Sequence, residues 1–101
     1  MTFAYTVRAE FADARHRAAY LDWLVGGHAA DVVAAGAAAA QVVTLDDGAV
    51  EARYLFPSAQ AFRDYEAGPA VALRAESAEK FGSADVRFHR STGALVVAVP
   101  A

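Results

Sequence analysis

His28 is the residue whose type and position best suit chemistry in this sequence. It is expected on a side of a long helix that is otherwise apolar, and the pair Gly26-Gly27 directly precedes it. An imidazole titrates near neutral pH, and a buried one needs a hydrogen-bond partner. That partner is either a core hydroxyl or carbonyl group or a bound ligand, and the sequence leaves both open. The residues expected on this side of the helix are Leu21, Leu24, Val25, His28, Val32 and Ala35.

Tyr5 and Tyr54 are the two phenols expected to face His28. Alternation along their strands places both on the apolar side of a sheet, beneath the helices. Two hydroxyls and an imidazole in an apolar layer could orient a small ligand, or transfer a proton with His28 as the general base. In the simpler alternative, a tyrosine hydroxyl donates to His28 and all three groups are only satisfied members of the core. An enclosed cavity of roughly a few hundred Å³ beside His28 would favour a ligand.

Trp23 is the only tryptophan, five residues before His28. At about 100° per residue it lies roughly 140° around an α-helix from His28, so the two side chains are not expected to face the sheet centre together. We interpret Trp23 as an anchor at an edge or interface. The alternative is a residue that stacks on a ligand at the mouth of a pocket.

Arg74 and Arg90 could clamp a carboxylate, because a guanidinium offers a fork of donors. Carboxylates that could pair with them are available in Glu76, in Glu79 and in the partner of a dimer, so we expect solvated ion pairs for both arginines.

Metal or cofactor chemistry is not indicated by the sequence. His16 and His89 lack metal-ligand spacing with another histidine or carboxylate. There is no phosphate-cradling glycine loop and no serine in a nucleophile elbow. We therefore expect neither a metal nor a cofactor.

The composition limits the class of protein. A chain of 101 residues is long enough for one domain, here 1–101, with a two-layer core. Its hydrophobic content of 56% exceeds the usual share of a soluble domain, which favours self-association. With a net charge of −3 and a single lysine, Lys80, we expect no nucleic-acid partner. No apolar run reaches the ~20 residues of a membrane span and no signal peptide is recognisable, so we expect a cytoplasmic protein.

The hydrophobic period alternates between that of strands and that of helices, in the order βαββαβ. Asp13 and Ser58 are suitable helix caps, and Asp46-Asp47-Gly48 is a hairpin signal. The expected elements are a strand over 3–11, a helix from Asp13 to Gly36, strands over 38–45 and 49–56, a helix from Ser58 that Gly68-Pro69 interrupts and that resumes over 70–81, and a last strand from Asp85 toward Val99 with a bend at Gly93.

This order predicts an α+β, ferredoxin-like fold: a four-stranded antiparallel sheet with two helices on one face. The open face would display Thr6, Arg8, Glu51, Arg53 and Leu55, with part of the second strand and the apolar C-terminal run nearby. Such a face is too mixed for a core and too apolar for a bare surface. We expect a second copy to cover it, as in a dimeric α/β barrel. The alternative is a monomer whose arginines pair with neighbouring carboxylates in solvent.

The sequence also resembles a small uncharacterised bacterial family, a domain of unknown function in the dimeric α/β-barrel, ferredoxin-like superfamily. The resemblance covers nearly the whole chain and implies the fold and dimerisation, but no activity. Relatives in the wider superfamily include cofactor-independent monooxygenases of aromatic polyketides, muconolactone-type isomerases and small-ligand binding modules. The resemblance rests on Tyr5, Trp23 and His28 five apart, Gly36, Tyr54, Ser58, Tyr65, Leu73-Arg74, Phe81-Gly82, and Phe88 with Arg90.

Two functional hypotheses follow. The first is a homodimeric binding or structural module that holds a small apolar or aromatic ligand between helices and sheet, with Tyr5, Trp23, His28 and Tyr54 as contacts. The second is a cofactor-independent enzyme, monooxygenase-like or isomerase-like, with His28 as general base and Tyr5 or Tyr54 orienting the substrate oxygen. We favour the first, because the sequence lacks a second acid or base of clear role.

Overall fold

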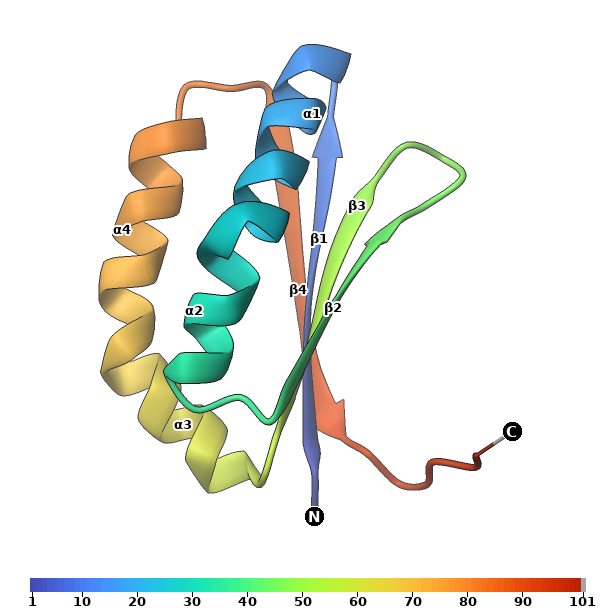
Figure 1. Ribbon diagram of the computed structural model, residues 1–101, viewed down its shortest axis with the longest axis vertical. Coiled ribbons are helices and arrows are strands. Elements are labelled where there is room, and N and C mark those ends of the chain that lie inside the picture. The colour runs from blue at the N-terminus through green and yellow to red at the C-terminus, as the bar shows by residue number, and fades with distance from the viewer. Residues whose placement is uncertain (101) are drawn as a thin grey trace.

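The computed structural model describes residues 1–100 as a four-stranded antiparallel sheet with the helices packed on one face (Figure 1). The strand order β2-β3-β1-β4 makes the first and third strands neighbours at the centre. The predicted α+β ferredoxin-like fold is confirmed. The elements are β1 (Phe3–Phe11), α1 (Ala14–Trp23), the π-helical turn η1 (Leu24–His28), α2 (Ala29–Ala34), β2 (Ala39–Thr44), β3 (Val50–Phe56), α3 (Ala59–Ala67), α4 (Pro69–Phe81) and β4 (Val86–Ala94).

Local chemistry sets most element boundaries. The side chains of Asp13 and Ser58 each accept a hydrogen bond from a backbone N–H shortly after them, at 2.8 and 3.0 Å, and so cap α1 and α3. Gly36 and Gly48 have φ angles of 137° and 92°, where a side chain is unfavourable, and they end α2 and close the β2–β3 hairpin. Pro69 lacks a backbone N–H and opens α4. These predicted boundaries are confirmed.

The sheet register places the predicted apolar face against the helices. Tyr5 lies opposite Tyr54, and Ala9 lies opposite Val50. These four residues are at most 5% exposed. Burying them and the helix faces between the two layers supplies the main hydrophobic stabilisation. The other large buried side chains are Tyr20, Leu24, Val32, Phe56, Phe62, Tyr65 and Phe81.

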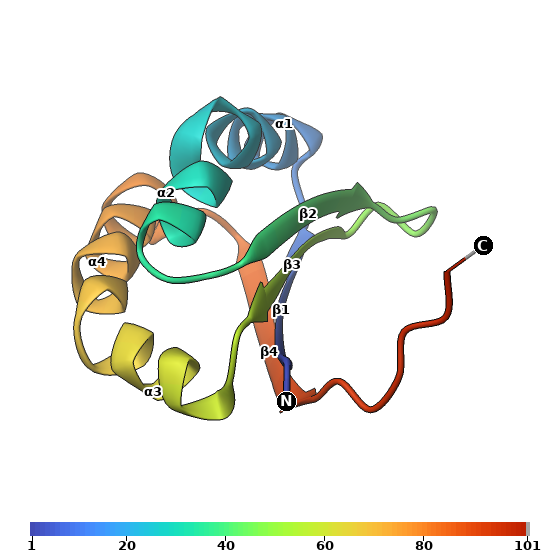
Figure 2. The same ribbon diagram turned by 60° about the horizontal axis from the view of Figure 1, so that its bottom comes forward.

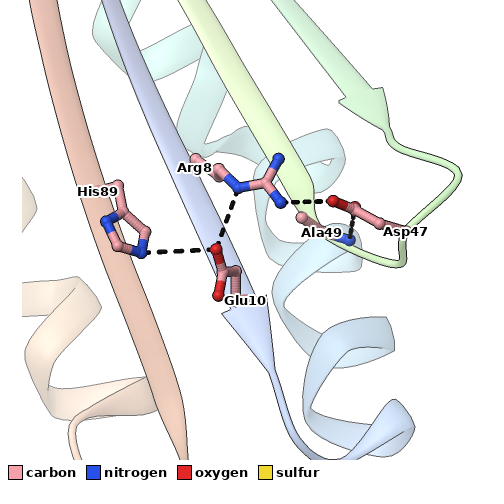
Figure 3. A network of polar contacts seen from close by, with 5 residues as sticks. All are labelled: Arg8, Glu10, Asp47, Ala49 and His89. Carbon is pink, nitrogen blue, oxygen red and sulfur yellow. Dashed lines mark hydrogen bonds and ion pairs between the residues drawn. The ribbon is translucent and has the colours of Figure 1, made fainter.

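The face of the sheet away from the helices carries a network of charges (Figure 3). The Nη2 atom of Arg8 is 2.5 Å from Oδ2 of Asp47 in the hairpin, and its Nε atom is 3.2 Å from Oε1 of Glu10. The Nε2 atom of His89 is 3.5 Å from the same Glu10 oxygen. Arg53 is paired in the same way with a carboxylate of its own strand. These arginines therefore have counter-ions within the chain, and such exposed pairs contribute little to stability.

The C-terminal apolar run differs from the prediction. Strand β4 ends at Ala94, and residues 95–100 leave the sheet on the side away from the helices (Figure 2). The reason is that β1 begins at Phe3, which pairs with Ala94, so a longer β4 would have no neighbouring strand. Only Leu95 remains attached, through a 2.8 Å bond from its N–H to the carbonyl of Thr2. The expected bend at Gly93 is also wrong, because Gly93 lies within the ladder.

Every helix within residues 1–100 is too short or too polar to cross a bilayer.

Candidate functional site

A small cavity of about 60 Å³ lies between the helices and the sheet. It is lined by all four tyrosines of the chain, its only tryptophan and His28. It adjoins a larger groove of about 400 Å³ between α4 and β4, and Ser77 and Phe88 line both spaces. The cavity is smaller than the few hundred Å³ expected of a ligand pocket, but it opens toward that groove. The tyrosines are Tyr5, Tyr20, Tyr54 and Tyr65.

His28 ends η1 and is half-buried against this cavity. Its Nδ1 atom is buried and has no hydrogen-bond partner among residues 1–100. Burial lowers the pKa of His28, and the charges of Glu76 and Asp31 only partly oppose that effect. The imidazole is therefore neutral at pH 7, with an unsatisfied polar atom that costs stability. The alternative in which a tyrosine hydroxyl satisfies His28 is not observed.

Trp23 stacks directly on His28, with ring centroids 3.9 Å apart and an angle of 18° between the planes. The prediction that the two side chains diverge is wrong, because residues 24–28 form a π-helical turn. In that turn the N–H of Ala29 donates to the carbonyl of Leu24, five residues back, so side chains five apart come into line. Gly27 breaks the helical geometry there, with φ 168° and ψ −31°.

The signal for this turn is present in the sequence as a tryptophan and a histidine five apart with two glycines between them. Placing the side chains by a regular helical period of 3.6 residues does not detect this signal. The indole N–H of Trp23 also donates to the carboxylate of Glu76 on α4, at 3.0 Å. This bond fixes the indole, and the indole in turn fixes the plane of the imidazole.

Tyr5 and Tyr54 lie side by side as their strand register requires, with centroids 5.9 Å apart and rings stacked at 25°. Burial raises the pKa of Tyr54, and it raises the pKa values of Tyr20 and Tyr65 to about 12. These phenols are hydrogen-bond donors at neutral pH. Tyr20 and Tyr65 were missed as site residues, although each lies at helical spacing from buried apolar residues, Leu24 and Phe62 respectively.

The two arginines of the cavity differ in their surroundings. Arg74 forms an ion pair with Glu66, not with Glu76 or Glu79 as predicted. The Glu66 bond and the nearby Tyr5 hydroxyl raise the pKa of Arg74. Arg90 has no carboxylate within 4.0 Å in residues 1–100, so the ion pair expected for it within the chain is absent.

Metal ligands are not assembled in the part of the chain that the structure describes. No group of three or more histidine or carboxylate side chains is placed to hold an ion there. His89 contacts Glu10 on the opposite face of the sheet.

Comparison with known proteins identifies the fold. No protein-family model and no curated protein matches the sequence. Among solved structures, the chain is similar to a dimeric ferredoxin-like protein from an uncultured marine organism, with 13% identity over 100% of both chains and a TM-score of 0.76. It is similar to SnoaB, a cofactor-independent oxygenase from Streptomyces nogalater, with 13% identity over 99% of this chain and 98% of the other and a TM-score of 0.72.

A third similar structure is a monooxygenase from the gene ActVA-Orf6 of Streptomyces coelicolor in complex with the ligand Nanaomycin D. The identity is 19% over 98% of this chain and 92% of the other, and the TM-score is 0.67. At these identities the likeness establishes the ferredoxin-like fold that dimeric and monooxygenase proteins share.

Proposed function

We propose that this domain binds a small aromatic molecule in the cavity between its helices and its sheet. The observation that carries the proposal is the buried, unpartnered Nδ1 of His28 beside a cavity lined by every tyrosine and the tryptophan of the chain. A buried polar atom without a partner costs about 1–3 kcal/mol, and a ligand hydroxyl would remove that cost. The aromatic walls supply the apolar contact that ligand pockets require.

The size of the cavity indicates how such a ligand would bind. A closed void that accepts benzene measures about 150 Å³, whereas the cavity here measures about 60 Å³. A ring must therefore enter from the adjoining groove of about 400 Å³ between α4 and β4 and displace side chains such as Phe88, which is 38% exposed. The ligand would lie partly in the cavity and partly in the groove.

The proposal is tested by calorimetric titration with 1-naphthol and with its saturated analogue, decahydro-1-naphthol. We expect 1-naphthol to bind and the saturated alcohol to bind more weakly, because only the flat ring stacks on Trp23 and the tyrosines. His28→Leu should weaken 1-naphthol binding about fivefold by removing the hydrogen-bond partner. His16→Leu on the exposed side of α1 is the matched control. Absence of 1-naphthol binding to the natural sequence would overturn the proposal.

A second candidate function is proton abstraction by His28 in a cofactor-independent enzyme. It is favoured by the lowered pKa of His28, which keeps the imidazole available as a base, and by the neutral phenols, which can donate to a developing enolate oxygen. We expect the protein to accelerate exchange of the C1 hydrogens of 2-tetralone in D₂O, followed by proton NMR. His28 would remove the proton from carbon and return a deuteron. Equal exchange rates for the natural sequence and His28→Gln would leave binding as the function.

We also propose that two copies associate through the open face of the sheet. Two structurally similar proteins are described as dimeric, and the 56% hydrophobic content exceeds what one small core needs to hide. Native mass spectrometry at micromolar concentration should give twice the chain mass. A monomer under these conditions would overturn this part of the proposal.

A further inference from the structure

The cavity concentrates positive charge in an acidic protein. The chain has twelve carboxylate residues against nine lysines and arginines, with a net charge of −3. The residues that line the cavity nevertheless include Arg74 and Arg90 and no carboxylate. Arg90 is exposed where the cavity opens, and a cleft lined by one sign of charge attracts ligands of the opposite sign.

Arg74 is partly neutralised by a carboxylate of residues 1–100, whereas Arg90 is not. Arg74 forms its ion pair with Glu66, while Arg90 has no carboxylate within reach in residues 1–100. Of the two cations, only Arg90 has a guanidinium fork free for a bidentate partner.

The sheet register aims Arg90 at the site. Arg90 on β4 lies opposite Val7 on β1, and both side chains face the helices, as Tyr5 does two residues before Val7. The charge of Arg90 acts to lower the pKa values of Tyr20 and Tyr65 against the larger effect of burial. The guanidinium is thus close enough to influence phenols on α1 and α3.

The position of Arg90 also relates the cavity to its entrance. Arg90 lines both the small cavity and the open groove between α4 and β4, as Arg74 and Ser77 also do. A group bound there would remain close to solvent while the rest of the molecule reached inward to Trp23 and His28. This suits a ligand with a charged end and an aromatic body.

We propose that Arg90 binds the carboxylate of the ligand, so that the domain selects aromatic carboxylates over neutral aromatic molecules. The inference rests on the proposed ligand-binding function. It specifies that the ligand is an anion and that Arg90 is the residue that recognises its charge. The carboxylate would accept two hydrogen bonds from Arg90 at the groove, with the ring inserted toward the tyrosines. Arg90 is then a residue that determines specificity.

The test compares 2-naphthoate with 2-naphthamide, which has the same ring system and nearly the same shape but no charge. Affinities come from calorimetry at pH 7.5 and low salt, and the indole N–H signal of the only tryptophan reports binding beside Trp23. We expect 2-naphthoate to bind about tenfold more tightly, because a charge-assisted bidentate contact is stronger than a neutral one. Both probes should shift the indole signal.

Arg90→Gln should weaken 2-naphthoate binding about tenfold and 2-naphthamide binding much less, so that the preference for the carboxylate is lost, and Arg90→Lys should retain part of that preference. Arg87→Gln is the matched control, since Arg87 is on the same strand but pairs in register with Glu10 on the open face. Equal binding of both probes, with no effect of Arg90→Gln, would overturn the inference and leave the proposed function standing. Failure of both probes to bind the natural sequence would overturn the two together.

Discussion

At the scale of single residues, His28 combines features that rarely occur together in a residue that only packs. It is half-buried, its pKa is lowered, one face of its ring is covered by Trp23, and its Nδ1 has no partner in residues 1–100. Perturbed titratable groups that border cavities are candidates for function. The unsatisfied Nδ1 atom destabilises the folded state, so its effect is measurable in the free energy of unfolding.

Stability should decline with acidification because of His28. Its folded pKa lies below the unfolded value of about 6.5, so the unfolded chain binds a proton more readily as the pH falls through that value. The stabilisation is therefore present above about pH 6.5 and is lost as the pH falls toward the folded pKa. We expect urea denaturation to give a smaller free energy of unfolding at pH 5.5 than at pH 7.5, and His28→Gln to reduce this difference.

This pH window avoids the carboxylates with lowered pKa values. Bonds from Arg15 lower the pKa of Asp13 to about 2, and a backbone bond to Ala49 and the Arg8 pair lower that of Asp47. These groups contribute stability that is lost only at more acidic pH. His16→Gln is the control for the loss of a histidine. The same pH dependence in the natural sequence and in His28→Gln would contradict the assignment.

The position of a site residue can be predicted from the sequence where a regular helix or strand period determines it. Tyr5 and Tyr54 share a face because strand alternation is strict, and that prediction needs only the antiparallel pairing of β1 with β3. The free guanidinium of Arg90 could not be predicted in this way. Whether Arg90 is paired depends on which carboxylates the tertiary fold brings near, and Glu76, one of the partners considered for it, instead accepts a hydrogen bond from Trp23.

At the scale of elements, the π-helical turn η1 builds the site. Deviations of this kind interrupt α-helices and are frequently found at functional sites. Here the turn brings Trp23 and His28 into a stack that an α-helix would separate by roughly 140°. Gly27 is the one residue of the turn with non-helical φ and ψ.

Gly27→Ala should therefore disturb the stack. Alanine favours a regular α-helix over glycine by about 1 kcal/mol, and a methyl group at this position meets no atom within 4 Å. We expect the indole N–H signal of Trp23 to move and the pKa of His28 to change, both measured by NMR. Gly26→Ala is the matched control, because Gly26 lies in the same turn, has helical geometry and also has free space around it. An unchanged stack in Gly27→Ala would show that packing of α2 alone maintains the turn.

Other elements were predictable where local chemistry decides. The caps at Asp13 and Ser58 and the glycine of the β2–β3 turn act on their immediate neighbours, so the sequence suffices. The end of β4 is different. The run 95–99 has the composition of a strand, but its pairing is decided by where β1 begins, at Phe3. The length of β4 therefore depends on β1, a segment at the other end of the chain, as well as on its own sequence.

At the scale of the whole molecule, the open face of the sheet has two unlike halves. The half near the β2–β3 hairpin carries the ion pairs of Arg8, Asp47 and Glu10 (Figure 3). The other half has a hollow of about 180 Å³, in which Ala4, Ala39 and Leu55 supply apolar surface and Gln41 and Arg53 are among the polar lining residues. The C-terminal segment leaves the sheet toward this side (Figure 2), and its Val96, Val97 and Val99 are 84%, 69% and 83% exposed.

Within the proposed dimer, we expect the C-terminal segment of each copy to cover the apolar half of the other copy's sheet. A two-fold axis would make both contacts identical and would hide apolar side chains that are otherwise in water. Truncation after Ala94 should shift native mass spectra from dimer toward monomer, and Val97→Asp should act in the same direction. Arg63→Gln, at an exposed position of α3 on the helix side of the sheet, is the control that should leave the dimer intact.

A disulfide test separates exchange between copies from folding back onto the same sheet. The natural chain contains no cysteine, so introduced cysteines are unambiguous. Mixing the single variants Val97→Cys and Leu55→Cys under mild oxidation should yield a linked pair of different chains, because the segment of one copy meets the hollow of the other. If the segment instead covers its own sheet, the double variant will form the bond within one chain even at high dilution, and the mixed singles will remain unlinked. The second result would remove the segment from the interface.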